Sequence, residues 1–293
     1  MGRIKNFIRN INYLTKHSLW DQREEDIVYL TDKILEDAKY EYGLDDGYYR
    51  PRILDKEQSL ELILKSGKSF VRTGDGEVKI MMGMDQGFQR YEPEIADGLR
   101  KMLSEPNDNL LVGINRNYFI PGYMGGGGDF YRRHAYDYRQ YYKKILNEKI
   151  TYIDATCTGY ALGNHADAKT IEHYDKWVDA FKDRNLIIVC GQGILDKLEY
   201  DVFEKAKSKK FIYGPAKHAW DKHEELINQI KKEPKENTVI VFILGMAGKV
   251  MISELADMGY TCWDVGHLAK YYDALKRGVS GSKENVAKFY APD

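Results

Sequence analysis

The last third of the chain alternates between short apolar runs and longer amphipathic segments. Four runs of apolar, β-branched or aromatic residues have the length of buried strands, at 186–190, 210–213, 239–244 and 260–265. A segment with the helical spacing of apolar residues separates each run from the next. Because strands that alternate with helices pair in parallel through crossover helices, this region predicts an α/β fold with a mainly parallel sheet and helices on both faces.

The same alternation extends toward the amino terminus. The predicted helices are 55–65, 93–103, a tyrosine-rich segment that ends near 146, and 170–181, and the predicted strands are 69–72, 110–114 and 151–155. A run of four glycines at 125–128 interrupts the pattern. Fixing a glycine backbone costs more entropy than fixing any other residue, so we expect a loop there, either a lid over a site or a plain surface loop.

Two helical segments precede the α/β region. Apolar residues at helical spacing over 4–14, with lysine and arginine beside them, predict a short basic amphipathic helix, and a second amphipathic helix covers 27–38. The basic helix suits either an anionic membrane surface, through residues 1–16, or packing on its own domain or on a second subunit of a homo-oligomer. We therefore divide the chain into a helical extension (1–50), an α/β domain (51–275) and a tail (276–293).

Length and composition describe an ordinary globular protein. The chain has 293 residues, of which 43% are hydrophobic and 30% charged, enough to bury a large core. The formal net charge of -1 argues against a nucleic-acid partner, since no global basic field is present. No run approaches the ~20 apolar residues that span a bilayer. Without a signal peptide, and with three cysteines that lack metal-ligand spacing, we expect a cytoplasmic protein.

The turns after the strands are the places to search for chemistry, because ligands of parallel sheets bind beyond the carboxyl ends of the strands. The strand at 69–72 leads into the sequence RTGDGE at 72–77. Holding the Asp75 and Glu77 carboxylates close together costs free energy unless a cation offsets it, which suggests a divalent metal and, through it, a phosphorylated ligand. The alternative is an Asp-Gly turn whose side chains cap the next helix.

Two glycine-rich turns follow later strands. The turn from Gly245 through Gly248 to Lys249 joins a strand to a helix, so that small residues admit a phosphate to the helix N-terminus and the lysine adds a positive charge. Gly191 and Gly193 bracket a second such turn. Each of these turns has a plain alternative, a tight connection without a ligand.

Two further strand ends carry titratable side chains. The last strand ends in Asp264, three residues before His267. If the sheet brings them to the carboxylate pair, His267 is a candidate metal ligand or general base, and Asp264 is a candidate to orient it or to bind a sugar hydroxyl. Lys217 and His218 follow another strand in the same way. A single histidine is more often structural, so this position alone decides nothing.

In combination, these blocks resemble the bacterial D-type glycosyltransferases, a Rossmann-like family with an Asp-x-Glu metal motif. The resemblance covers about 60–273 and rests on RTGDGE at 72–77, FQRY at 88–91, the blocks at 201–207 and 214–219, and the late block from 244 to 267. It implies transfer of a hexose from a nucleotide sugar, typically UDP-glucose, onto a growing surface glycan or a glycoprotein-linked oligosaccharide. The implied metal is Mn²⁺ or Mg²⁺.

The resemblance also implies roles for the candidate residues. Glu77, with Asp75, would hold the metal against the donor diphosphate. His267 would assist at the metal or deprotonate the acceptor hydroxyl, with Asp264 as the second candidate base. The residues expected to contact the nucleotide sugar are Arg72, Gly74, Gly191, Lys217, Gly245, Gly248 and Lys249.

Three departures from the family pattern fall on the predicted donor side of the cleft. The chain has Leu-Asp-Lys at 195–197 where the family usually has Ser-Arg, and His218 where an asparagine is frequent. The family turn Gly-Pro-Thr-Ala-Thr is replaced by Gly-Met-Ala-Gly-Lys at 245–249, which loses two hydroxyl donors and gains a lysine.

Two other functions stay open at the level of sequence. A Rossmann-type NAD(P)-dependent oxidoreductase would bind its dinucleotide at 191–193, although the third glycine of that fingerprint is replaced by Asp196. A non-catalytic interaction subunit would keep the fold without the site. Motifs for a nucleophile elbow, a P-loop or a zinc protease do not occur in the sequence.

Overall fold

A computed structural model of the chain describes residues 23–42, 49–119, 128–159 and 167–278. It contains two compact units, one made of Met1–Arg50 with Tyr118–Arg139 and one of Pro51–Asn117 with Gln140–Asp293. The predicted basic helix at 4–14 and most of the glycine run at 125–128 lie outside the described residues. Membrane contact through residues 1–16 therefore stays a prediction.

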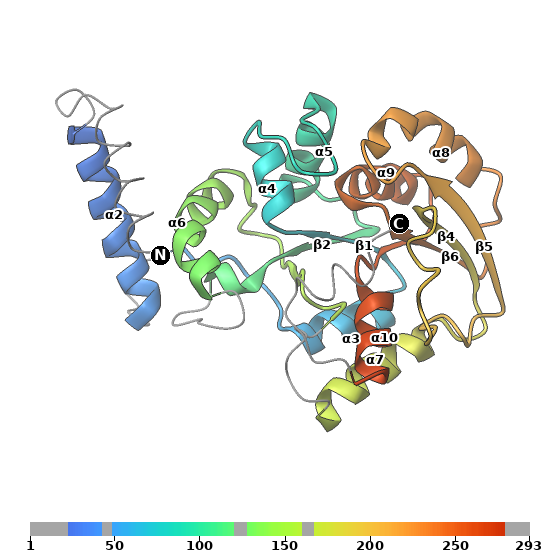
Figure 1. Cartoon of the computed structure of the whole chain (residues 1–293). Coiled ribbons are helices and arrows are strands. Elements are labelled where there is room, and N and C mark those ends of the chain that lie inside the picture. Colours follow the sequence, from blue (N-terminus) through green and yellow to red (C-terminus); the bar gives the residue numbers. More distant parts are fainter. Residues whose placement is uncertain (1–22, 43–48, 120–127, 160–166, 279–293) are drawn as a thin grey trace, which may run out of the picture. The chain divides into compact units, whose positions relative to one another are not determined.

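A seven-stranded sheet forms the centre of the larger unit (Figure 1). Its order is β3-β2-β1-β7-β6-β4-β5, and all neighbouring strands pair in parallel. The strands are β1 (Ser69–Thr73), β2 (Leu110–Ile114), β3 (Ile153–Asp154), β4 (Asn185–Gly191), β5 (Ser208–Gly214), β6 (Thr238–Ile243) and β7 (Cys262–Asp264). The predicted α/β class and its parallel sheet are confirmed.

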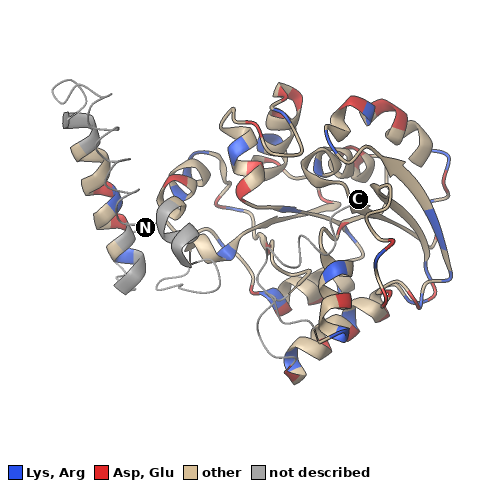
Figure 2. Cartoon of the chain, in the orientation of Figure 1, with Lys and Arg blue, Asp and Glu red and all other residues tan. Residues whose placement is uncertain are grey.

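Helices cover both faces of this sheet. On one face lie α4 (Asp75–Met81), α5 (Pro93–Ser104), α8 (His223–Ile230) and α9 (Gly245–Asp257), and on the other lie α3 (Lys56–Ser66), α7 (Ala168–Ala180) and α10 (Leu268–Lys276) (Figure 1). The inner strands β4 and β6 carry no charged residue, whereas lysines lie on the edge strand β5 and acidic residues on α8 (Figure 2). Strands buried on both faces are typical of parallel sheets.

Local signals account for several helix ends. Asp55 and Gln58 form a capping box at the start of α3, and Gly67 ends that helix with φ of 63°. Pro93 begins α5, and Gly259, with φ of 83°, follows α9. The third and last strands are shorter than the predicted 151–155 and 260–265. β3 is an edge strand that pairs with β2 over two residues only.

A cluster of aromatic side chains packs between α7 and the central strands β1 and β7. Trp177 on α7 meets Trp263 on β7 edge to face, with ring centroids 6.1 Å apart, and both contact Phe70 on β1. Phe181 packs against Phe203 at 4.9 Å. These rings fix β1 and β7 side by side, so the residues after them are held on a rigid base.

The smaller unit contains α2 (Arg23–Tyr42) and the first part of α6 (Gly128–Ile145). Arg139 is buried there, with Nε 2.8 Å from Glu36 Oε1, and its Nη1 donates to the carbonyl of Tyr118 at 3.0 Å. The predicted helix over 27–38 is thus confirmed as part of α2. Within the described ranges, no helix combines the length and the apolar character that crossing a membrane requires.

Candidate active site

A pocket of about 570 Å³ lies at the carboxyl ends of β1, β4, β6 and β7 in the larger unit. Strand β1 has β2, its successor in the chain, on one side and β7, the last strand of the chain, on the other. The order of the strands therefore changes direction at β1. This change of direction is the usual ligand position in open parallel sheets, and the volume is in the range of small-molecule sites. The pocket is therefore the first candidate for a catalytic site.

Most of the residues predicted from the sequence come together in this pocket. They are Arg72, Gly74, Asp75, Glu77, Gly191, Gly245, Lys249, Asp264 and His267. Two predicted residues do not line it. Lys217 lines a separate pocket of about 410 Å³ beside His218. Gly248 lies inside α9, where an added Cβ would come within 3.1 Å of the Phe242 ring, so this glycine serves helix packing.

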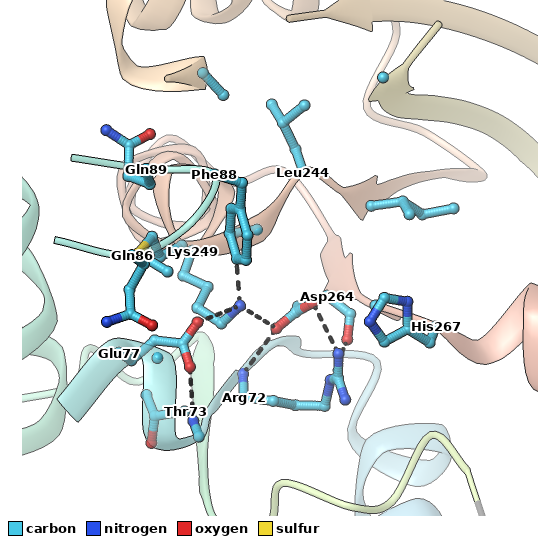
Figure 3. Close-up of a pocket in the computed structure, with 18 of the residues that line it drawn as sticks. Arg72, Thr73, Glu77, Gln86, Phe88, Gln89, Leu244, Lys249, Asp264 and His267 are labelled. Atoms are coloured by element: carbon cyan, nitrogen blue, oxygen red, sulfur yellow. Dashed lines mark hydrogen bonds and ion pairs between the residues drawn. The ribbon is translucent and has the colours of Figure 1, made fainter. Parts of the chain in front are cut away.

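Lys249 occupies the centre of the pocket wall. Its side chain extends from α9, one turn after Gly245, and ends between two carboxylates (Figure 3). Nζ lies 3.0 Å from Oε1 of Glu77 and 3.3 Å from Oδ2 of Asp264. The exposed fractions are 6% for Lys249, 8% for Glu77 and 5% for Asp264, so the three charges are paired almost without water.

Glu77 also caps the helix that follows β1. Its Oε2 accepts a hydrogen bond of 2.7 Å from the backbone N–H of Gly74, at the N-cap of α4. The helix-capping alternative is therefore observed for Glu77, together with a charge contact through the other oxygen. Asp75 lies at the first position of the same helix, and its side chain is exposed at the pocket. The two carboxylates point to different surroundings.

Asp264 and Arg72 form a second paired unit. Nη2 of Arg72 donates to Oδ1 of Asp264 at 3.2 Å, the backbone N–H of Arg72 donates to Oδ2 at 3.1 Å, and Nε donates to the backbone carbonyl of Asp264 at 2.8 Å. Nη1 donates to the carbonyl of Ala155 at 3.2 Å. Gly266, with φ of 52°, admits the guanidinium, because an added Cβ would lie 1.8 Å from Nη2.

The pairing sets the charge states of this cluster. Burial alone would raise the pKa of Asp264, but the positive charges of Arg72 and Lys249 lower it below the ordinary value. Burial alone would lower the pKa of Lys249, but Asp264 and Glu77 raise it. Asp264 is thus an anion held by fixed donors. This arrangement suits positioning of Arg72 and Lys249 better than proton transfer.

His267 is the titratable group best placed to accept a proton. Its ring reaches the pocket from the start of α10 (Figure 3). Part of the side chain is accessible to solvent at the pocket, but protein atoms crowd closely around the ring and displace much of its hydrating water. This desolvation, with the positive charges of Lys270 and Arg72, lowers the pKa of His267 to about 4. The imidazole is therefore neutral at pH 7.

The predicted metal site fails a test of fit. In the ranges that the structure describes, no three histidine, cysteine, aspartate or glutamate side chains converge to hold a metal ion. Asp75 is exposed, while both oxygens of Glu77 already have donors, Gly74 and Lys249. A divalent ion bound by Glu77 and Asp264 would have to displace the Lys249 ammonium. The metal role of Asp75 and Glu77 stays a prediction, and these residues as arranged do not suit it.

Several pocket residues were not predicted as site residues. Phe88 is 48% exposed, and its ring lies against Gly245, where an added Cβ would be 2.8 Å away. The uncharged polar residues in the lining that were not predicted are Thr73, Gln86, Gln89, Asn115, Thr156 and Gln192. Phe88 and Gln89 belong to the FQRY block at 88–91, which contributed to the family resemblance. An aromatic residue in a polar loop was the available signal.

The sequence matches a glycosyltransferase family and two proteins named as glycosyltransferases. A family model for the glycosyltransferase GT-D fold matches residues 70–292. The probable glycosyl transferase Gly of Streptococcus gordonii is 29% identical over 238 residues, which cover 78% of this chain and 33% of that protein. Glycosyltransferase GlyD of Streptococcus pneumoniae serotype 4 is 26% identical over 228 residues, 76% of this chain and 27% of that protein. The chain thus spans a third or less of these relatives.

Solved structures share the fold. A domain of unknown function 1792 with a distinct glycosyltransferase fold aligns with a TM-score of 0.74 at 24% identity, covering 85% of this chain and 87% of that one. A new glycosyltransferase of the same domain type, from Streptococcus sanguinis, aligns with a TM-score of 0.72 at 25% identity, covering 79% and 87%.

Proposed function

Because the chain belongs to the glycosyltransferase family with the GT-D fold, as its sequence predicted, we propose that it transfers a hexose from a nucleotide sugar to a glycan. UDP-glucose is the first donor to test, and a surface glycan or a glycoprotein-linked oligosaccharide is the proposed acceptor. One observation carries the proposal: the N-terminus of α9 opens on a pocket that also presents Lys249 and Arg72.

This end of α9 suits a diphosphate. The first turn of a helix has backbone N–H groups without partners in the helix and a partial positive charge. Gly245, with φ of 66°, brings the chain sharply from β6 into the helix, and Lys249 lies one turn further on. The leaving nucleoside diphosphate gains negative charge in the transition state, so fixed positive groups here would accelerate its departure.

His267 is the proposed general base. The acceptor hydroxyl oxygen would bond to the anomeric carbon of the donor sugar, and the bond from that carbon to the diphosphate oxygen would break, its electron pair leaving with the nucleotide. The acceptor proton would pass to the neutral imidazole of His267. Asp264 would hold Arg72 and Lys249 in place rather than take the proton.

The turn at Gly191 argues against the alternative function, a Rossmann-type oxidoreductase. A dinucleotide fingerprint places its glycines where a strand leads directly into a helix. Here β4 is followed by turns from Gln192 to Lys197 and not by a helix. The Asp196 carboxylate would lie 3.7 Å from a Cβ added at Gly193. A non-catalytic subunit would differ from the proposed enzyme by failing to turn over any donor.

A donor-hydrolysis screen tests the proposal without knowledge of the acceptor. Release of nucleotide from UDP-, GDP- and dTDP-sugars would be followed with the full chain, both with excess EDTA and with Mn²⁺. We expect slow release from one donor class, and Arg72→Met should reduce it at least about tenfold through loss of a charged contact. Arg52→Met, at an exposed position, is the matched control. No turnover of any donor, with binding of NADH instead, would refute the proposal.

A further inference from the structure

We infer that the Lys249 ammonium is a built-in cation at the donor diphosphate, in the place for which the sequence predicted a divalent metal. This inference rests on the proposed function, because it names the group that meets the diphosphate. It has two consequences. Donor binding needs no metal ion. In the wild-type protein, the Lys249 ammonium keeps a metal ion away from the carboxylates of Glu77 and Asp264.

The position of the ammonium carries the first step. Nζ bridges Glu77 of α4 and Asp264 of β7, at 3.0 and 3.3 Å, from a stem rooted in α9. These three elements meet at the pocket, and α4 lies far in sequence from α9 and β7, which follow one another. A bound cation commonly joins carboxylates of separate elements in this manner. Here a side chain of the protein makes the same bridge.

The occupancy of the carboxylate oxygens carries the second step. Oε2 of Glu77 is taken by the Gly74 N–H and Oε1 by Lys249. Oδ1 of Asp264 is taken by Arg72, and Oδ2 by both the Arg72 N–H and Lys249. Divalent ions such as Mg²⁺ need about six oxygen ligands in close contact. An ion between Glu77 and Asp264 would meet the Lys249 ammonium and the Arg72 guanidinium, and each of the four carboxylate oxygens there already accepts a donor.

The third step concerns access to the ligand. Lys249 and both of its carboxylate partners line the pocket. The remaining partner of Nζ is the carbonyl of Gly245 at 3.5 Å, a length at which a hydrogen bond is weak. An ammonium has three donor hydrogens, and with two held by the carboxylates the third, now directed weakly at Gly245, is left for a phosphate oxygen that enters beside that carbonyl.

The competing explanation is that Lys249 only stabilises the fold. A measurement of Mn²⁺ binding distinguishes this explanation from the inference. Binding of Mn²⁺ to the full chain would be titrated by the loss of the free-ion electron paramagnetic resonance signal, without donor. Wild type should leave the signal unchanged. Lys249→Met keeps the apolar stem, removes the donor at Oε1 of Glu77 and removes one of the two donors at Oδ2 of Asp264, and it should gain Mn²⁺ affinity by at least about tenfold. Lys101→Met, at an exposed position on α5, should behave as wild type.

The second measurement is calorimetric binding of UDP. Wild type should bind equally well in excess EDTA and in Mn²⁺, after correction for the Mn²⁺–UDP complex. Lys249→Met should lose about tenfold or more in EDTA and recover with Mn²⁺. Wild type that binds Mn²⁺ stoichiometrically, or that loses UDP binding in EDTA, would overturn the inference even if the variant fails to fold. A folded Lys249→Met with unchanged UDP affinity would overturn the role at the diphosphate.

Failure of the proposed function would look different. If wild type bound no UDP under any condition, the glycosyl-donor proposal and the diphosphate role would both fail. The Mn²⁺ titration would still decide whether Lys249 excludes a metal, since it uses no donor. The two results therefore separate an error about the ligand from an error about the cation.

Discussion

Replacement of Gly266 by alanine tests the packing of the site by a change of one methyl group. The new Cβ would lie 1.8 Å from Nη2 of Arg72, so the guanidinium must move and its bond to Asp264 is lost. The left-handed φ of 52° costs an alanine about 1–2 kcal/mol. Loss of a charged hydrogen bond adds about 1.5–3 kcal/mol. We expect a total loss of about 2.5–5 kcal/mol in the free energy of unfolding.

Gly67→Ala is the matched control for that variant. Gly67 has a similar φ of 63°, but within the described part of the chain no atom lies within 4 Å of its added Cβ. It should lose only the backbone part, about 1–2 kcal/mol. Urea denaturation followed by circular dichroism would measure both, and calorimetry would measure UDP binding to each. Equal destabilisation of the two variants would refute the argument that Gly266 makes room for Arg72.

Three further outcomes follow from the site. The rate of donor hydrolysis should stay constant from pH 8 to about 5 and fall only near pH 4. The reason is that the pKa of His267 is lowered to about 4, and the ring can no longer act as a base once it is protonated. A fall in rate centred near pH 6.5 would contradict the assignment of His267 as the base. Glu77→Gln keeps an acceptor for the helix cap but removes the charge beside Lys249, so donor turnover should be abolished while the fold persists; full activity would refute a role for Glu77. Phe88→Ala should weaken UDP binding about tenfold or more if its exposed ring stacks on the ligand, whereas Phe211→Ala, an exposed ring on β5, should leave binding unchanged.

The positions of the strand ends could be predicted because apolar runs and turn residues are local signals. Strand β2 matches the predicted 110–114, and β1 (Ser69–Thr73) differs by one residue from the predicted 69–72. The sheet order could not be predicted in this way. It depends on which strands pair after crossover, and this brings β7 between β1 and β6.

The interactions inside the site depended on a different kind of information. Asp75 and Glu77 were expected to converge because they are close in sequence. They belong to α4, where residues two apart are separated by about 200° around the axis. One carboxylate is therefore exposed and the other buried. The sequence shows that this chain has a lysine, Lys249, in a turn where the family usually has a hydroxyl residue. Its contacts with Glu77 and Asp264 could not be predicted, because they depend on where α9 packs.

The pairing of β1 with β7 has a consequence for synthesis of the chain. Arg72 and Asp264 lie 192 positions apart, and β7 fills the place beside β1 in the sheet. At about 5–20 residues per second, β1 would leave the ribosome about 10–40 s before its partner. During that interval one edge of an apolar strand has no neighbour, a state prone to mispairing. Slower translation of the last third would lengthen this exposure.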